Sequence, residues 1–168
     1  MIVYFETDIQ TLYNLIGQSV WHLQHLENVL SMVTAMKILQ KERDRGSKVT
    51  EDICLRALEK QRGFTLGPLI SAAKREQTIP SILLERFDHL LQERNWLIHK
   101  CVINEFLSLR SATRKQVLFD RISSFVDETI ALKNEINEIL EKWYESVGYD
   151  LDYANQIAKE TVREAEQR

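Results

Sequence analysis

Three polar side chains near the middle of the chain have the types and spacing to act together on a phosphate group. Arg94 and Asn95 are adjacent, and His99 follows four residues after Asn95. A guanidinium group offers a planar fork of N–H donors to phosphate oxygens, and an imidazole exchanges a proton near neutral pH. On a helix, Asn95 and His99 share a face, whereas Arg94 is turned about 140° from His99 and must bend across the face to join them.

The same residues interrupt two apolar rows of one expected helix, which starts near Thr78 and Pro80 and continues to about Asn104. Arg94 occupies the open slot of a row with three- and four-residue spacing that contains Leu83, Phe87, Leu90, Leu97 and Cys101. Asn95 occupies the matching slot of a neighbouring row that contains Leu84, Leu91, Ile98 and Val102. Because burial of unpartnered polar groups costs several kcal/mol, we expect both side chains to be paired, at the edge of a cleft, or at an interface.

A purely structural interpretation of the three residues stands beside the chemical one. Arg94 extends its charge to solvent or pairs with Glu93 or another acid, Asn95 bonds to a neighbouring helix, and His99 is an ordinary hydrogen-bonded histidine. His22 and His25 are spaced to share a metal, but no acidic or cysteine cluster accompanies them, and a solvated or hydrogen-bonded pair is the favoured interpretation.

The elements that must position these residues are helices. The chain has 168 residues with only five glycines and two prolines, and it shows no strand alternation. Helical spacing of apolar residues predicts helices over residues 8–45, with Asp8 as N-cap, over 51–62, over a short stretch after 65, and over 80–104. A polar loop at residues 108–113 precedes what is expected to be the longest helix, which ends at Gly148. A smaller helix is expected over residues 151–168.

The expected fold class is therefore all-α, a bundle of four main antiparallel helices with short additional helices. Apolar residues of the last long helix follow a near-heptad series, which predicts packing along the first helix. These are Leu118, Ile122, Phe125, Leu132, Ile136, Ile139 and Trp143, with Thr129 in the remaining place.

Charge is distributed unevenly along the chain. The net charge is −3, yet residues 127–168 carry eleven acids and five bases, whereas residues 86–121 carry seven bases and four acids. An anionic partner would therefore meet the middle stretch, where local positive charge surrounds Arg94 and His99. Two isolated cysteines, no leader-like segment and no long apolar run predict a soluble protein of the cytoplasm that does not enter a membrane.

The segment Arg94-Asn95-Trp96-Leu97-Ile98-His99 resembles the R-x4-6-H motif of HEPN domains, in the form that has Asn directly after Arg. The order of helices is also similar, with the motif late in the third main helix and one long helix after it. On this resemblance, residues 1–168 form one HEPN-like domain, with a core over about 8–145 and a C-terminal helix over 150–168.

The resemblance implies a metal-independent endoribonuclease of the prokaryotic toxin or antiviral defence type. It acts as a homodimer with a composite cleft, and a cognate antitoxin protein is a further partner. His99 would be the acid–base group, Arg94 would bind the scissile phosphate, and Asn95 would orient the histidine or a phosphate oxygen. Attack by the RNA 2′-hydroxyl would leave a 2′,3′-cyclic phosphate, with no cofactor or metal. The expected RNA-binding residues are Lys100, Arg110, Arg114 and Lys115.

One position departs from many HEPN toxins, which carry a modifiable tyrosine two residues after the histidine, where this chain has Cys101. That form of regulation is therefore not expected here. Two other functions stay open: a non-catalytic HEPN-like module that binds RNA, a nucleotide or a protein, and a helical oligomerisation scaffold in which Arg94 is structural.

Overall fold

The computed structural model describes residues 2–101, 106–146 and 163, and within them every regular element is helical, with no strand. The elements are α1 (Ile2–Asp44), α2 (Glu51–Arg62), α3 (Leu66–Glu76), α4 (Ser81–His99), the short 3-10 helix η1 (Phe106–Arg110) and α6 (Ala112–Ser146). The predicted all-α fold class is confirmed.

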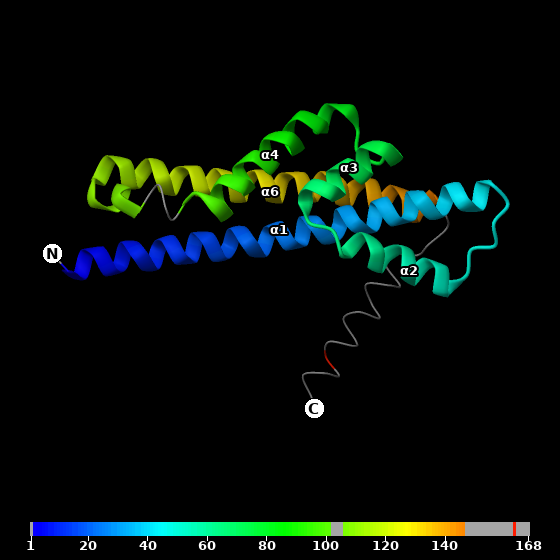
Figure 1. The fold of residues 1–168 in the computed structure, drawn as a ribbon, viewed down its shortest axis with the longest axis horizontal. Helices are drawn as coiled ribbons and strands as arrows, with labels where there is room; N and C mark the ends of the chain where they lie inside the picture. Colours follow the sequence, from blue (N-terminus) through cyan, green and yellow to red (C-terminus); the bar gives the residue numbers. More distant parts are fainter. Residues whose placement is uncertain (1, 102–105, 147–162, 164–168) are drawn as a thin grey trace.

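α1 and α6 are the two long helices, and they pack against each other along much of their length (Figure 1). Their contact is apolar because residues three and four apart on each helix bring large aliphatic side chains onto one stripe. Each such side chain contributes about 1.5–3 kcal/mol when it is buried. The predicted packing of the last long helix along the first is confirmed. Nearly completely buried members of the contact include Leu23, Leu26, Leu30, Ile122, Leu132 and Ile136.

α1 and α6 run in the same direction, which corrects the antiparallel arrangement expected for the main helices (Figure 1). Near the start of both, Asp8 of α1 forms an ion pair with Lys115 of α6. Near the end of both, Leu39 of α1 and Trp143 of α6 line one pocket. The short α3 accounts for the parallel direction of α1 and α6. The chain reverses once before α3 and once after it, so α2 and α4 both run antiparallel to α1, and α6 after them runs parallel to it.

α4 does run antiparallel to α6, and arginine–glutamate contacts hold the two together. Arg86 of α4 donates through Nε to Glu128 at 2.7 Å and through Nη1 to Glu135. Farther along, Arg121 of α6 donates to both carboxylate oxygens of Glu93, at 2.7 and 2.9 Å. The apolar row predicted from spacing runs past both polar contacts and is confirmed as buried: Leu83, Phe87, Leu90, Leu97 and Cys101.

α2 and α3 pack against α1 on the side of its second half (Figure 1). The first turn of α3 is anchored there because Glu27 of α1 accepts a hydrogen bond from the backbone N–H of Leu66 at 2.8 Å. This contact satisfies one of the N–H groups that every helix start leaves without an intrahelical partner. α3 ends at Glu76, and the next residue, Gln77, has a left-handed φ of 56° and closes the helix in the manner more often adopted by glycine.

Two boundaries near the motif differ from the expected ones. α4 begins at Ser81, with Pro80 in the N-cap position, and its last residue is His99, since Lys100 leaves helical geometry at φ −125°. The helix was expected to reach about Asn104, a residue that lies outside the described part of the chain. The polar loop over residues 108–113 is also more ordered than expected: it contains part of η1, and both Ser108 and Leu109 are buried.

The first helix also differs at its start and in its length. α1 begins at Ile2, so Asp8 is inside the helix and is not its N-cap. The carboxylate of Asp8 instead binds Lys115, which is the stronger partner for an ionised acid at this position. With 43 residues, α1 is longer than α6 with 35, although α6 was expected to be the longest helix.

Some predictions fall on residues outside the described part of the chain. These are the helix end at Gly148, the helix over 151–168, and Val102 of the second apolar row. Among the described helices, none is long and apolar enough to cross a bilayer.

Candidate functional site

Arg94 is the half-buried member of the motif and projects from the last third of α4. Its Nη1 donates to Asn95 Oδ1 at 3.2 Å. Its Nε is closed off from solvent and has no hydrogen-bond acceptor among the described residues. A buried N–H without an acceptor costs about 1–3 kcal/mol, so an anionic oxygen that reaches this guanidinium would be stabilised by it.

The charge of Arg94 also acts inside the protein, on Glu27 of α1. Burial raises the pKa of Glu27, and the hydrogen bond from Leu66 together with the positive charge of Arg94 opposes that rise. The two side chains attract each other without a direct ion pair in the described structure. Arg94 therefore helps to keep ionised the carboxylate that anchors the start of α3, whatever ligand it also binds.

Asn95 and His99 are both exposed, one helical turn apart on α4. His99 is the final residue of the helix, so its imidazole lies at an open end. The row that contains Asn95 is only partly buried, since Leu91 before it is half-buried and Ile98 after it is 44% exposed. Asn95 is exposed and accepts a hydrogen bond from Arg94, and pairing was one of the placements expected for it. This row lies at the edge of the packed surface of α4, where a polar side chain costs little.

The suggested pairing of Arg94 with Glu93 is not observed. Glu93 binds Arg121 of α6 instead, and the hydrogen bonds from Arg121 hold the pKa of Glu93 below its ordinary value despite partial desolvation. The guanidinium carbon of Arg121 lies 3.6 Å from the ring centroid of Trp96. A cation at this distance over an indole is attracted to it by about 0.5–2 kcal/mol. Arg94 is thus left without the neighbouring acid.

A pocket of about 370 Å³ opens beside the motif, between the end of α4 and the start of α6. Trp96, Arg114, Val117 and Arg121 are among the side chains that line it. Aromatic rings and arginine planes are the surfaces on which single-stranded bases stack. The pocket therefore offers one aromatic ring and two arginine side chains on a recess that includes Trp96 of the motif.

The four predicted RNA-binding cations are placed differently. Arg114 lines the pocket described above, and Lys100 and Arg110 are exposed at the ends of α4 and η1. Lys115 forms an ion pair with Asp8, and its Nζ lies 2.8 Å from both carboxylate oxygens. Its charge is already compensated within the protein, so it offers an RNA phosphate less than the other three do.

Sequence reasoning missed three side chains that shape this region. Trp96 and Arg121 form the wall of the pocket, and Glu27 balances the charge of Arg94. Trp96 lies inside the motif, and an aromatic residue among cations is a signal for nucleic-acid contact that could have been used. Glu27 carries no such signal, because its proximity to Arg94 depends on how α1 crosses α4.

No group of three His, Cys, Asp or Glu side chains that could hold a metal ion occurs in the described part of the chain. His25 is exposed, and its ring makes an edge contact with Trp21 at 4.9 Å between centroids. The motif region holds donors and a proton acceptor in the form of Arg94, Asn95 and His99.

Comparison of the chain with protein-family models, with curated proteins and with solved structures finds no match. The likeness to HEPN domains therefore stays a prediction, which rests on the segment from Arg94 to His99 and on the order of the helices.

Proposed function

We propose that the protein is a metal-independent endoribonuclease of HEPN type that acts in the cytoplasm. The observation that carries the proposal is the half-buried Arg94, whose Nε lacks an acceptor, one residue before Asn95 and five before the exposed His99. A cation for the phosphate and an imidazole for proton transfer are the minimum that RNA cleavage requires, because RNA carries its own nucleophile.

In the proposed reaction, Arg94 binds the scissile phosphate and Asn95 holds Arg94 or a phosphate oxygen in place. The 2′-hydroxyl oxygen attacks phosphorus while His99 accepts its proton. The O2′–P bond forms, the P–O5′ bond breaks, and a proton returns to the 5′ oxygen. The products are a 2′,3′-cyclic phosphate and a 5′-hydroxyl, so neither water nor a redox partner is consumed.

The proposal includes a homodimer with the motifs of both copies over one cleft, and a four-helix core formed by α1, α2, α4 and α6 with α3 as an addition. Two exposed apolar side chains at the motif end support an interface there. Ile98 is 44% exposed beside His99, and Val117 is 64% exposed at the rim of the pocket. A toxin or defence role with a cognate antitoxin belongs to the same proposal.

A second candidate is a non-catalytic RNA-binding module. It is favoured by the action of Arg94 on Glu27, which gives the arginine a structural task at the start of α3. In that case the stacking surface of Trp96 and the exposed Arg114 bind RNA while no bond is broken. The scaffold alternative would need Arg94 for stability alone.

The deciding experiment incubates purified protein with a mixed RNA in EDTA, alongside His99→Ala and the matched control His89→Ala. His89 is also exposed on α4 but lines a different pocket. Wild type and His89→Ala should cleave, and His99→Ala should lose at least about 100-fold in rate, as expected for removal of an acid–base group. End-group analysis should show 2′,3′-cyclic phosphates.

Three results would overturn the proposal in different ways. RNA binding with no cleavage by wild type would select the non-catalytic module. Equal cleavage by wild type and His99→Ala would place the chemistry elsewhere. A requirement for added metal would exclude the metal-independent reaction. Because an antitoxin would mask the activity in cells, the assay uses protein purified alone.

A further inference from the structure

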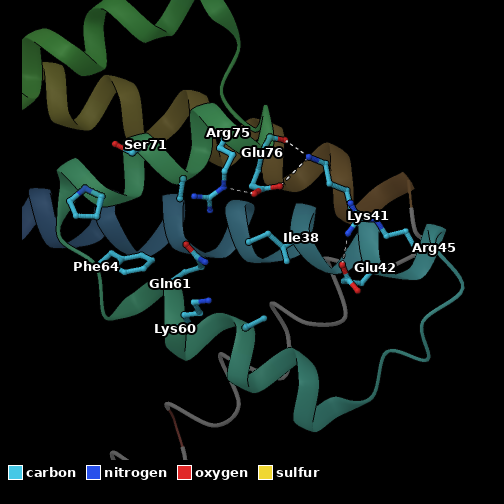
Figure 2. A pocket seen from close by; sticks show the side chains of 13 residues that line it. Ile38, Lys41, Glu42, Arg45, Lys60, Gln61, Phe64, Ser71, Arg75 and Glu76 are labelled. Carbon is cyan, nitrogen blue, oxygen red and sulfur yellow. Dashed lines mark hydrogen bonds and ion pairs between the residues drawn. The ribbon is translucent and has the colours of Figure 1, made fainter.

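A second pocket lies between α1, α2 and α3, far along α1 from the motif end of α4 (Figure 1, Figure 2). Its volume is about 660 Å³, within the roughly 300–1,000 Å³ of small-molecule sites. The pocket is lined both by apolar side chains and by several charged ones. Nothing in the proposed ribonuclease reaction uses these residues, and the inference does not rest on that reaction.

Gln61 is the observation that points to a ligand. It is the buried residue of α2, only 3% exposed, and it lines the pocket. Its Oε1 is closed off from solvent and receives no hydrogen bond from the described residues. A buried carboxamide oxygen without a donor costs about 1–3 kcal/mol, so it is a feature that folding alone would not favour.

The charges around Gln61 leave an excess of positive charge. Glu76 is shared by Lys41, at 3.0 Å, and Arg75, at 2.9 Å, and these hydrogen bonds lower the pKa of Glu76. Arg45 is paired with Glu42 at 2.8 Å. Lys60 has no ion pair among the described residues. Four cations therefore stand against two carboxylates, which leaves two positive charges for a ligand to balance.

The rest of the lining is apolar. Phe64, at the end of α2, lies on one side, and Ile38 of α1 lies across from it (Figure 2). Figure 2 shows the Gln61 carboxamide between Arg75 of α3 and Lys60 of α2. The terminal torsion of glutamine is broad and two-fold, so a half-turn of the carboxamide turns its oxygen toward the pocket. A ligand would thus meet an aromatic ring, a hydrogen-bond acceptor and two cations.

We propose that this pocket binds a small phosphate monoester whose body is a flat ring with an N–H donor. The phosphate, with a charge of about −1.5 to −2 at pH 7, pairs with cations of the lining, Lys60 among them, and balances the two excess positive charges. The ring packs against Phe64, and its N–H donates to Gln61 Oε1. Binding satisfies the buried oxygen that the free protein leaves without a donor.

The test uses adenosine 5′-monophosphate as the probe, measured by isothermal titration calorimetry with the full chain. Saturable binding with one site per chain is expected. Adenosine, which lacks the phosphate, and ribose 5-phosphate, which lacks the ring, should each bind at least about tenfold more weakly. Inorganic phosphate reports the contribution of the cations alone. Equal binding of ribose 5-phosphate would overturn the ring and its donor.

Gln61→Leu and Lys60→Gln identify the site, with Lys142→Gln on exposed α6 surface as the matched control. Gln61→Leu should lower affinity for the probe about tenfold while its melting temperature without ligand stays equal or rises, because an unsatisfied buried oxygen is removed. If that variant fails to fold, Lys60→Gln decides, since Lys60 is exposed.

His99→Ala should bind the probe as wild type does, which separates this pocket from the motif. Absence of saturable binding by wild type would overturn the proposal. So would unchanged affinity in both Gln61→Leu and Lys60→Gln, or loss of binding in His99→Ala. RNA cleavage by Gln61→Leu at the wild-type rate is expected, so the two proposals fail independently.

Discussion

Arg86 and Arg94 lie eight residues apart on α4, and their surroundings differ sharply. Arg86 donates three hydrogen bonds to Glu128 and Glu135 of α6, and these bonds raise the pKa of its guanidinium. Arg94 donates one hydrogen bond, to the neutral carboxamide of Asn95, and its Nε has no acceptor among the described residues. Both are on the same helix, and the contrast comes from what α1 and α6 place opposite each one.

The difference separates a structural arginine from one that is available to a ligand. A guanidinium whose donors are filled by carboxylates has no capacity left for a phosphate. A guanidinium with an unfilled donor retains that capacity. Arg94 lies in α4 beside Asn95 and two residues before Trp96, which lines the pocket.

The largest expected effect is on RNA cleavage by Arg94→Ala compared with Arg86→Ala. Removal of a positioned donor to the reacting phosphate typically lowers the rate by about 100- to 1,000-fold, so Arg94→Ala should lose that much. Arg86→Ala should cleave within a few-fold of wild type. Single-turnover cleavage rates of folded variants, matched by circular dichroism, give the comparison. Equal losses in the two variants would abolish the distinction.

The reverse order is expected for stability. Arg86→Ala should lower the free energy of unfolding by about 1 kcal/mol, because it removes partly exposed ion pairs that join α4 to α6. Arg94→Ala should cost less, since it also removes an unsatisfied N–H. Urea unfolding followed at 222 nm measures both. A larger loss for Arg94→Ala would favour the scaffold role.

A smaller effect is expected for the adjacent cations Arg114 and Lys115 on α6. Arg114→Ala should weaken RNA binding several-fold, as expected for the loss of one phosphate contact. The slope of the logarithm of the binding constant against the logarithm of the salt concentration should become shallower by about one unit. Lys115→Ala should change RNA binding less, because Asp8 already neutralises it. Filter binding at several salt concentrations would show the contrast, and a larger salt effect for Lys115→Ala would refute it.

The smallest effect concerns pH, through Glu27 and Glu93. The pKa of Glu27 is raised above the ordinary glutamate value of 4.5, so the ionised side chain destabilises the fold at neutral pH. As the pH falls toward 4.5, Glu27 becomes protonated in the folded protein and this destabilisation disappears. The pKa of Glu93 is lowered, so its contribution is complete above about 4.5 and is lost as pH falls through the lowered value.

Urea unfolding across this pH range should therefore separate the two glutamine variants. Any gain in the free energy of unfolding of Glu27→Gln over wild type should shrink as the pH falls from neutral to 4.5. The loss in the free energy of unfolding of Glu93→Gln should stay constant over that pH range and shrink only below it. Parallel curves for both variants would contradict the assigned surroundings of the two carboxylates.

Much of the fold was predictable because it follows from local periodicity. The apolar series through Leu118 and Ile136 on α6 and the row through Phe87 on α4 are buried as expected. The parallel direction of α1 and α6 was not predictable, because it depends on counting α3 as a full reversal of the chain. Spacing within each helix carries no information on the direction of its partner.

The candidate site was predictable only in part, for a related reason. Arg94, Asn95 and His99 are a contiguous pattern, and their relative placement follows from helical geometry. The partners of these residues are distant in sequence: Glu27 lies 67 residues before Arg94, and Arg121 lies 28 residues after Glu93. Such pairings form only when the helices are packed, and they determine which arginines have their N–H donors bound to carboxylates.

The pairing of α1 with α6 also sets the order of events during synthesis. α1 leaves the ribosome first, but the helix that covers its apolar stripe is complete only about 100 residues later, at Ser146. At roughly 5–20 residues per second, this stripe waits on the order of 5–20 s for its partner. α2 and α3, which follow directly and pack on the same helix, are the elements that shield part of α1 from other nascent chains in that interval.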